Sequence, residues 1–211
     1  MGSDVSTGAG RKARGREERR QAIVDGAFAV FARQGYGQAC VKEIAREAGV
    51  AKPTVYNHLA DKESLYREAV EAAADRVGAR CLAAVDRLRE VEAAADPRAG
   101  LGTAARDLLR ICQDEEARAV RRLADAETAQ FPGLAASVRE RTALRIRSAL
   151  ADRLARLALA GRLRPCEPET AAEHLLALLT GPLEYRPDAD PDAVAEAAVE
   201  VFLRAYGVGR G

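Results

Sequence analysis

Tryptophan is absent from this sequence of 211 residues and methionine occurs once, so the large aromatic side chains are four phenylalanines and five tyrosines. A core with so few rings must be built mostly from small aliphatic side chains. The abundant alanine favours helices, because alanine enters a helix at the lowest cost and is poor in strands. The composition therefore predicts an all-α fold.

Long apolar runs are missing as well. No stretch approaches the roughly 18 residues that a membrane span requires, and the N-terminus lacks the apolar segment of a secretory signal. The formal net charge is only +1, whereas disordered chains combine low hydrophobicity with a large net charge. We therefore expect a folded, cytoplasmic protein without membrane contact.

Cysteine is scarce and scattered, at Cys40, Cys81, Cys112 and Cys166, with no C-x-x-C pair and only two histidines to assist. This spacing indicates neither a zinc site nor a disulfide framework. Buried thiols are the simplest interpretation, and a redox-sensing thiol is the alternative. The sequence also lacks the nucleophile-base sets, paired carboxylates and glycine-rich phosphate loops of enzymes, so we predict no catalytic residue, metal or cofactor.

Charge is unevenly distributed along the chain. Residues 1–66 carry 11 basic and 8 acidic groups, a net +3, whereas residues 67–211 carry a net −2. All four lysines, Lys12, Lys42, Lys52 and Lys62, lie in the first part. The amino end is therefore the part suited to a negatively charged partner.

Apolar periodicity and helix start and stop residues divide the chain into about nine helices and no strand. A flexible basic arm is expected over residues 1–15, because nothing there can be buried. The helices are expected at about 17–34, 41–49, 52–60, 62–93, 97–112, 115–129, 132–161, 168–181 and 191–206. Gly181-Pro182 is expected to close the eighth of them.

The interval 40–62 carries the strongest signal. Ala45, Gly49 and Val55 supply a small residue where two helices touch, a glycine suited to positive φ, and a branched residue for the inner face of the second helix. This arrangement is typical of a helix-turn-helix. With Val55 and Leu59 facing inward, the outer side of the second helix displays polar side chains. They are Lys52, Pro53, Thr54, Tyr56, Asn57 and His58.

These outward residues suit the major groove of DNA, where a recognition helix is placed. Lys52 can donate to guanine edges, and Asn57 can offer a donor and an acceptor to adenine. Pro53 and the methyl group of Thr54 can contact thymine methyl groups.

Phosphate contacts are expected beside these base contacts. Tyr56 and His58 can donate hydrogen bonds to phosphates. Lys62, in the first turn of the next helix, adds a cation to free backbone N–H groups and is expected to clamp a phosphate.

The stretch GREERRQAIVDGAFAVFARQGYGQACVKEIAREAGVAKPTVYNHLADKESLYREAV, about residues 15–70, resembles the N-terminal domain of the TetR family of bacterial transcriptional repressors. The resemblance implies a homodimer whose C-terminal helices dimerise and enclose a small-molecule pocket, with ligand binding releasing DNA. Cys40 departs from the Thr or Ser usual in the family, and with Glu43 it forms a capping box whose hydroxyl is replaced by a thiol. Ala51 replaces a common serine.

The resemblance divides the chain into the arm, a DNA-binding domain over 16–62 and a ligand-binding and dimerisation domain over 63–211. The segment from Phe131-Pro132 through Ala172 is similar to the C-terminal domain of a common TetR subgroup. Candidate pocket residues lie near the middle or end of helices that surround the family's pocket. They are Cys112, Gln130, Phe131, Arg145 and His174.

His174 is open to two interpretations, a hydrogen-bonded core or interface histidine or a ligand contact. The last two helices carry more apolar surface than we expect the other helices of one chain to cover, so we expect a four-helix interface in the dimer. Its residues are Leu175, Leu178, Leu179, Val194, Ala198, Val201 and Phe202.

The predicted function is a ligand-responsive regulator that binds double-stranded operator DNA as a homodimer and is released by an effector. A helical adaptor without DNA binding is the alternative, and activation in place of repression is open. The sequence does not choose the effector or the operator.

Overall fold

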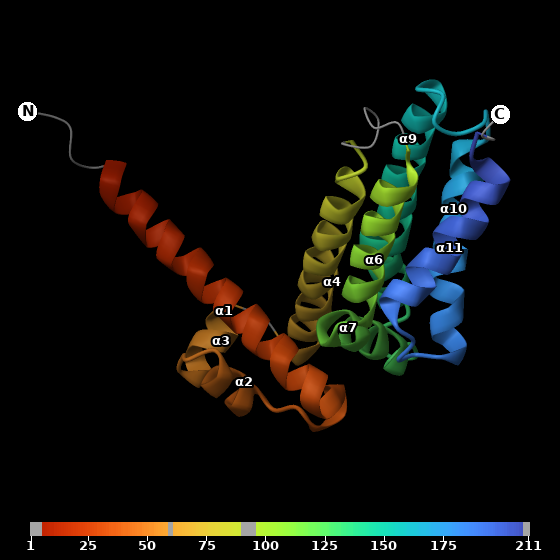
Figure 1. Ribbon diagram of the computed structural model, residues 1–211. Helices are drawn as coiled ribbons and strands as arrows, with labels where there is room; N and C mark the ends of the chain where they lie inside the picture. Colours follow the sequence, from red (N-terminus) through yellow and green to blue (C-terminus); the bar gives the residue numbers. More distant parts are fainter. Residues whose placement is uncertain (1–5, 59–60, 90–95, 209–211) are drawn as a thin grey trace, which may run out of the picture. The chain divides into compact units, whose positions relative to one another are not determined.

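The structure is a computed structural model that describes residues 6–58, 61–89 and 96–208, with one isolated bridge between Leu163 and Gly207 and otherwise helices and connections (Figure 1). The segments are α1 (Ser6–Gln38), α2 (Val41–Glu47), α3 (Lys52–His58), α4 (Lys62–Asp86), α6 (Arg98–Gln113), α7 (Glu115–Ala126), α8 (Leu134–Arg139), the π-helical η1 (Glu140–Leu144), α9 (Arg145–Leu159), α10 (Pro168–Tyr185) and α11 (Pro191–Tyr206). Since α8, η1 and α9 run on without a break, these eleven segments make nine helices. The all-α prediction is confirmed.

The chain divides into two compact units. The first unit comprises residues 1–73 and 119–138, and the second unit comprises residues 74–118 and 139–211. This division differs from the predicted boundary at residue 62, because the start of α4 and the segment 119–138 pack with the N-terminal helices. Among the described residues, no helix is both long and apolar enough to cross a membrane.

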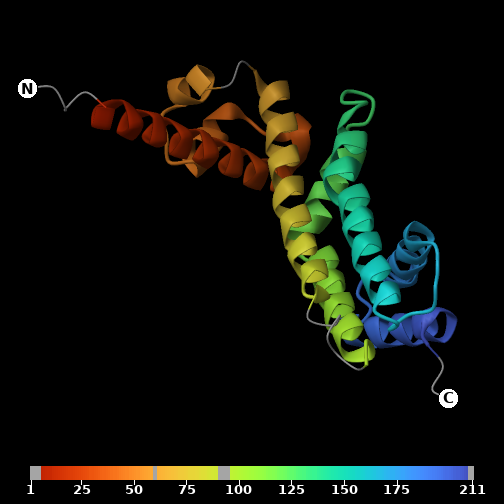
Figure 2. The same ribbon diagram turned by 90° about the horizontal axis from the view of Figure 1, so that it is seen from above.

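In the first unit α1 packs against α2, and α2 against α3 (Figure 2). The buried face of α1 carries Ile23, Ala27 and Phe31, all with no exposed surface, which follows their helical spacing. Gly26 lies at the contact with the end of α2, where an added Cβ would come within 2.9 Å of the Ala48 nitrogen. Glycine therefore lets the two helices approach.

The N-terminal arm is a correction. Residues 6–15 were expected to form part of a flexible arm, yet α1 begins at Ser6. Arg11, Lys12 and Arg14 are favourable helix residues, and the stretch from Ser6 to the predicted start contains no proline. The predicted stop is confirmed in part, because Gly35 has a φ of 75° and interrupts the helical backbone before Gln38.

In the second unit α10 packs against α9 and α11, and α11 packs against α6 (Figure 1). Side chains cap the first turns of several helices: the Asp190 carboxylate accepts from the Asp192 N–H at 3.1 Å, and Asp114 accepts from the Ala117 N–H at 2.8 Å. Glu167 accepts from the Thr170 N–H at 2.6 Å, and backbone hydrogen bonds hold its pKa below the ordinary value.

Several helix ends differ from the predictions. α10 continues through Pro182 to Tyr185, because a proline four residues from a helix end removes only one N–H donor, the one directed at the Leu178 carbonyl. α7 ends at Ala126 and α8 begins at Leu134 rather than Pro132. α4 ends at Asp86, and residues 90–93 of the predicted helix lie outside the described residues.

Candidate nucleic-acid interface

The turn between α2 and α3 has the geometry that the sequence predicted. Gly49 has a φ of 64°, and the Val50 N–H donates to the Ala45 carbonyl at 2.9 Å, which closes the turn. Ile44 and Ala45 on α2 and Val55 on α3 are buried beneath it. Burial of Val55 orients α3, so the opposite face of this helix is presented to solvent. α2, the turn and α3 together form a helix-turn-helix.

That outer face of α3 carries most of the predicted DNA-reading residues. Lys52, Pro53 and Asn57 are exposed, Tyr56 is 50% exposed, and Thr54 is half-buried. The Lys52 ammonium lies 5.9 Å from the centre of the Tyr56 ring, a distance at which a cation and a ring attract each other. These side chains are therefore available together to a partner.

The predictions for His58 and Leu59 concern side chains that lie outside the described residues. His58 is the last residue of α3.

Lys62 begins α4, where it was predicted to clamp a phosphate. Its ammonium donates to the Gly37 carbonyl at 3.4 Å and lies 4.5 Å from the centre of the Tyr36 ring. The adjacent Asp61 caps α4 by accepting from the Ser64 N–H at 2.6 Å, and this backbone hydrogen bond holds the pKa of Asp61 below its ordinary value. The lysine is thus held by α1 residues at the start of a capped helix.

Cys40 stands at the N-cap of α2 but makes no side-chain cap. Its thiol donates instead to Glu43 Oε2 at 3.5 Å, while the Glu43 N–H donates to the Cys40 carbonyl at 3.0 Å. The predicted capping box is wrong in this respect, because the weakly polar thiol reaches the carboxylate rather than the backbone. The side chain is exposed beside the helix-turn-helix.

Four rings form a cluster beneath Lys62. Tyr66 packs against Phe31 and Tyr36, and Phe131 packs against both tyrosines, with ring centres 4.9 to 5.1 Å apart. The buried Tyr66 hydroxyl donates to the Leu123 carbonyl at 2.7 Å. Burial raises the pKa of Tyr66 to about 12, so its neutral, donating form persists in the folded protein. This aromatic cluster joins α1, α4 and the segment before α8.

Tyr36 and Gly37 are functional candidates that sequence reasoning missed. Tyr36 supports the Lys62 ammonium with its ring, and the hydroxyl of Tyr36 accepts from the Gln130 side chain at 3.3 Å. The signal is the Gly-Tyr-Gly sequence near the end of α1, where an aromatic residue is flanked by two glycines.

The five predicted pocket residues are divided between the two units: Gln130 and Phe131 lie in the first, and Cys112, Arg145 and His174 lie in the second. Phe131 belongs to the aromatic cluster, and Gln130 binds Tyr36 and Glu63, so both serve the first unit. In the second unit Arg145 lies 3.6 Å from Asp75. His174 is exposed and its Nδ1 lies 2.6 Å from the Tyr206 hydroxyl, so the hydrogen bond was expected correctly but a core position was not.

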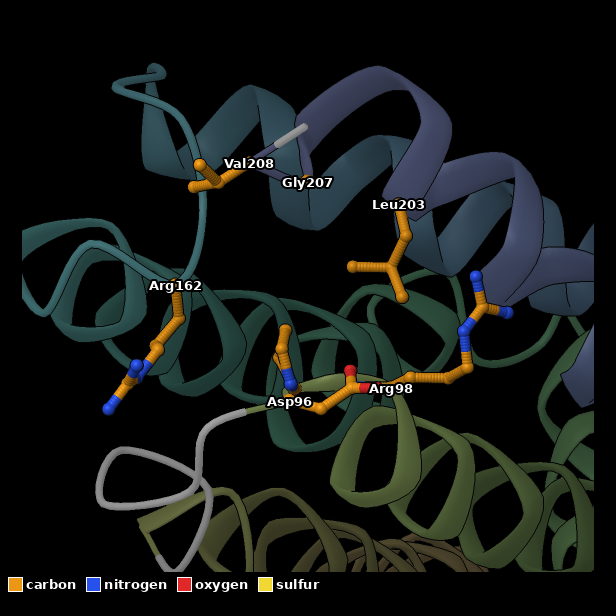
Figure 3. A pocket seen from close by; sticks show the side chains of 7 residues that line it. Asp96, Arg98, Arg162, Leu203, Gly207 and Val208 are labelled. Atoms are coloured by element: carbon orange, nitrogen blue, oxygen red, sulfur yellow. The ribbon is translucent and has the colours of Figure 1, made fainter. Parts of the chain in front are cut away.

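In the described part of the second unit, surface cavities lie away from the predicted pocket residues. One of about 350 Å³ is lined by Asp96, Pro97, Arg98, Arg162, Leu203, Gly207 and Val208 (Figure 3). The side chains of Arg98 and Arg162 extend in different directions there, so they do not converge on one ligand position (Figure 3). None of the predicted pocket residues lines it, because helical periodicity identifies a face and not the partners that face it.

The predicted dimer residues divide into two groups. Five are at least nine-tenths buried within one chain, because α9 and α6 cover them: Leu175, Leu179, Val194, Ala198 and Phe202. The expectation that one chain could not cover this surface is therefore wrong for these five. Val201 is 49% exposed, and Leu178 is half-buried.

Val201 and Leu178 line a mostly apolar groove of about 340 Å³ between α10 and α11. Its other residues are Pro182, Arg186, Ala193, Val194, Ala197 and Ala198. The apolar surface left for a partner is thus narrower than the sequence suggested.

Comparison with known proteins agrees with this geometry. Residues 23–69 match the family described as bacterial regulatory proteins of the tetR family, and residues 99–208 match the AefR-like transcriptional repressor C-terminal domain. A TetR-family regulator structure from Mesorhizobium loti is 31% identical, covers 92% of this chain and 98% of that chain, and has a TM-score of 0.83. Another, from Pseudomonas syringae pv. tomato, is 26% identical over 90% of this chain and 97% of that chain, with a TM-score of 0.63.

The chain matches the curated relatives over less than a third of their length. The regulator AcrR of Shigella flexneri is 37% identical over 62 residues, which are 29% of each chain. The activator FasR of Mycolicibacterium smegmatis is 39% identical over 62 residues, 29% of this chain and 28% of that protein. The two family matches cover both ends of the chain, and the helix-turn-helix lies inside the first of them. The chain belongs to the TetR family of transcriptional regulators, which bind DNA through this N-terminal domain.

Proposed function

We propose that this regulator is a repressor that binds a palindromic operator as a homodimer and leaves it when a small-molecule effector binds. The match to an AefR-like repressor C-terminal domain supports repression. The observation that carries the proposal is the exposed face of α3, with Lys52, Tyr56 and Asn57 outward and Val55 buried. Lys62 is held at the start of α4 by its bond to the Gly37 carbonyl. A solvent face without a partner would not need this concentration of DNA-suited donors.

Reading and holding the DNA are assigned to different side chains. Lys52 and Asn57 contact base edges, with Pro53 and Thr54 against thymine methyl groups. Lys62, Tyr56 and His58 bind phosphates, and Cys40 lies beside the backbone of the DNA.

The test is a titration of each variant with operator and with scrambled DNA across a salt series, after selecting the operator from a random pool. Lys52→Ala and Asn57→Ala should each lose about 1 to 3 kcal/mol per base contact on the operator alone. Lys62→Ala should weaken binding to both DNAs about equally and reduce the salt dependence by about one counterion per subunit. Equal losses of Lys52 and Asn57 variants on both DNAs would show that these side chains do not read bases.

The homodimer is proposed to form through the groove between α10 and α11. Val201 and Leu178 offer the exposed apolar surface, and a two-fold interface would place this groove against its own copy. Val201→Glu should give a monomer by sedimentation at micromolar concentration and weaken operator binding, whereas Glu196→Gln, on the charged side of α11, should not. A folded Val201→Glu variant that stays dimeric would place the interface elsewhere.

Effector release is proposed to act through the distance between the two recognition helices of the dimer, which must match successive major grooves about 34 to 36 Å apart. A thermal-shift screen against small molecules should yield a compound that stabilises the protein and lowers its operator affinity. If stabilising compounds leave operator binding unchanged, the C-terminal domain does not release DNA by this route.

A further inference from the structure

The contact between α4 and α6 in the second unit has a well-defined antiparallel register. Two ion pairs fix it: Arg87, directly after α4, with Asp107 on α6, and Arg80 on α4 with Asp114, directly after α6, at 2.5 Å. The carboxylate partner moves later in the sequence as the arginine moves earlier, and the series continues with Arg76 and Glu116 of α7 at 2.9 Å. In this register the residue next to Arg80 lies opposite the residues just before Asp114.

Two of the four cysteines occupy those opposite positions. Cys81 follows Arg80 on α4, and Cys112 lies two residues before Asp114 on α6. The Cys112 side chain lies within hydrogen-bonding reach of the Cys81 thiol. Cys81 is 1% exposed, whereas Cys112 is only partly covered. No local sequence pattern predicts this pair, because 30 residues separate the two cysteines.

The surroundings assign different roles to the two thiols. The hydrogen bond to Cys112, followed by burial, raises the pKa of Cys81, so Cys81 stays protonated. Cys112 is the sulfur that solvent can reach. The Arg80 guanidinium acts against this rise in the pKa of Cys81, whereas Asp114, which is itself paired with Arg80, adds to the rise. An accessible sulfur beside a buried proton donor is the arrangement of a reacting and a resolving cysteine.

We propose that Cys81 and Cys112 form an oxidisable dithiol that a hydroperoxide closes to a reversible disulfide, joining α4 covalently to α6. This site is separate from the helix-turn-helix and does not depend on the proposed repressor function.

The chemistry balances in two steps. The Cys112 thiolate attacks the outer peroxide oxygen, the O–O bond breaks, and the products are Cys112 sulfenic acid and, after protonation, water or an alcohol. The Cys81 sulfur then attacks the sulfenic sulfur, and the S–O bond breaks. The departing hydroxide takes the Cys81 proton and leaves as water. The peroxide is reduced by two electrons, and the two thiols are oxidised by two.

The test uses the full-length protein with hydrogen peroxide at low protein concentration, followed by thiol counting and tryptic mass spectrometry. The four free thiols should fall to two, and a linked peptide pair, CLAAVDR with ICQDEEAR, should appear with a mass two hydrogens below the sum. Dithiothreitol should restore both peptides. The oxidised protein should also gain several degrees in Tm, because the disulfide constrains the unfolded chain.

Cys112→Ser should abolish the linked peptide and the rise in Tm while keeping the helical circular dichroism spectrum. If serine at Cys112 perturbs packing, Cys81→Ala serves as a second variant. It should also abolish the linked peptide and the rise in Tm. The matched control is the double variant Cys40→Ser with Cys166→Ser. It should still form the linked peptide and show the rise in Tm, and its thiol count should fall from two to none after peroxide. Peroxide that yields only sulfinic acid at Cys112, or a disulfide that includes Cys40 or Cys166 in its place, would overturn the proposal.

Discussion

The two units of this regulator are stabilised by different kinds of contact. The first unit holds six of the nine aromatic residues, Phe28, Phe31, Tyr36, Tyr56, Tyr66 and Phe131, and the second unit holds Tyr185, Phe202 and Tyr206. In the second unit, small and aliphatic side chains fill the core while arginine-carboxylate pairs such as Arg80–Asp114 and Arg110–Asp192 line its surface.

This difference follows from what each unit must position. Lys62 needs a fixed place, and rings supply large contact areas with few rotatable bonds, so the aromatic cluster holds the start of α4 rigidly. In the second unit the helices approach closely through small residues such as Gly78. Its surface ion pairs contribute little energy individually, because solvent screens them, but they favour one helix register over others.

Among the changes that test this difference between the units, removing a buried ring should lower the free energy of unfolding most. Phe131 is 1% exposed and contacts Tyr36 and Tyr66, so Phe131→Ala should lower the free energy of unfolding by about 3 to 5 kcal/mol. Urea denaturation followed by circular dichroism measures this loss. The control, Tyr185→Ala, removes a ring that is 85% exposed and should change stability by no more than about 0.5 kcal/mol. Similar losses in both variants would contradict the importance of the cluster.

Adding a methyl group at a tight helix contact in the second unit should lower the free energy of unfolding by a smaller amount. A Cβ on Gly78 would lie 2.5 Å from the Arg141 carbonyl oxygen, a backbone atom that cannot rotate away. Gly78→Ala should therefore cost about 1 to 3 kcal/mol in thermal or urea unfolding. Gly181 in α10 has no atom within 4 Å of such a Cβ, so Gly181→Ala should stabilise by up to about 1 kcal/mol. Stabilisation by both alanines would show that α4 has room at Gly78.

The smallest effect concerns the hydroxyl inside the aromatic cluster. Tyr66→Phe leaves the Leu123 carbonyl without its donor and should cost about 0.5 to 1.5 kcal/mol near neutral pH. Because burial raises the folded pKa of Tyr66 to about 12, the unfolded chain releases this proton first, near pH 10. Its contribution is therefore complete below pH 10 and is lost as the pH rises toward 12.

Unfolding measured from pH 7 to 11.5 tests this dependence. The difference in stability between the wild-type protein and Tyr66→Phe should shrink, and then reverse, above pH 10. A constant difference across the series would mean that Tyr66 ionises equally easily in both states.

Local rules predicted the first unit well. The turn at Gly49, the burial of Val55 and the outward face of α3 all follow from residues within a span of fifteen, so periodicity and φ preference determine them. Tyr36 was different, because its role depends on Lys62 and Gln130, which lie 26 and 94 residues further along the chain. No local pattern encodes such a contact.

The second unit shows the same limit more strongly. Periodicity correctly indicated that Phe202 and Leu175 face inward, but it could not distinguish a core within one chain from an interface between two. Likewise, Gln130 and Phe131 were assigned to a pocket by their place near a helix end, whereas their partners belong to the first unit. Helix faces could be predicted from the sequence, and their pairing could not.

The π-helical turn at Glu140–Leu144 has a consequence for how this chain can vary in length. In an uninterrupted α-helix the core position following Val138 by two turns would be Arg145, and Ile146 would be rotated by about 100° from it. The wider turn absorbs one residue, so Ile146 is buried while Leu144 and Arg145 remain exposed. A relative with one residue fewer between Val138 and Ile146 could form an unbroken α-helix and bury the same side chains, so an alignment gap at this point would mark a change of helix type and not of fold.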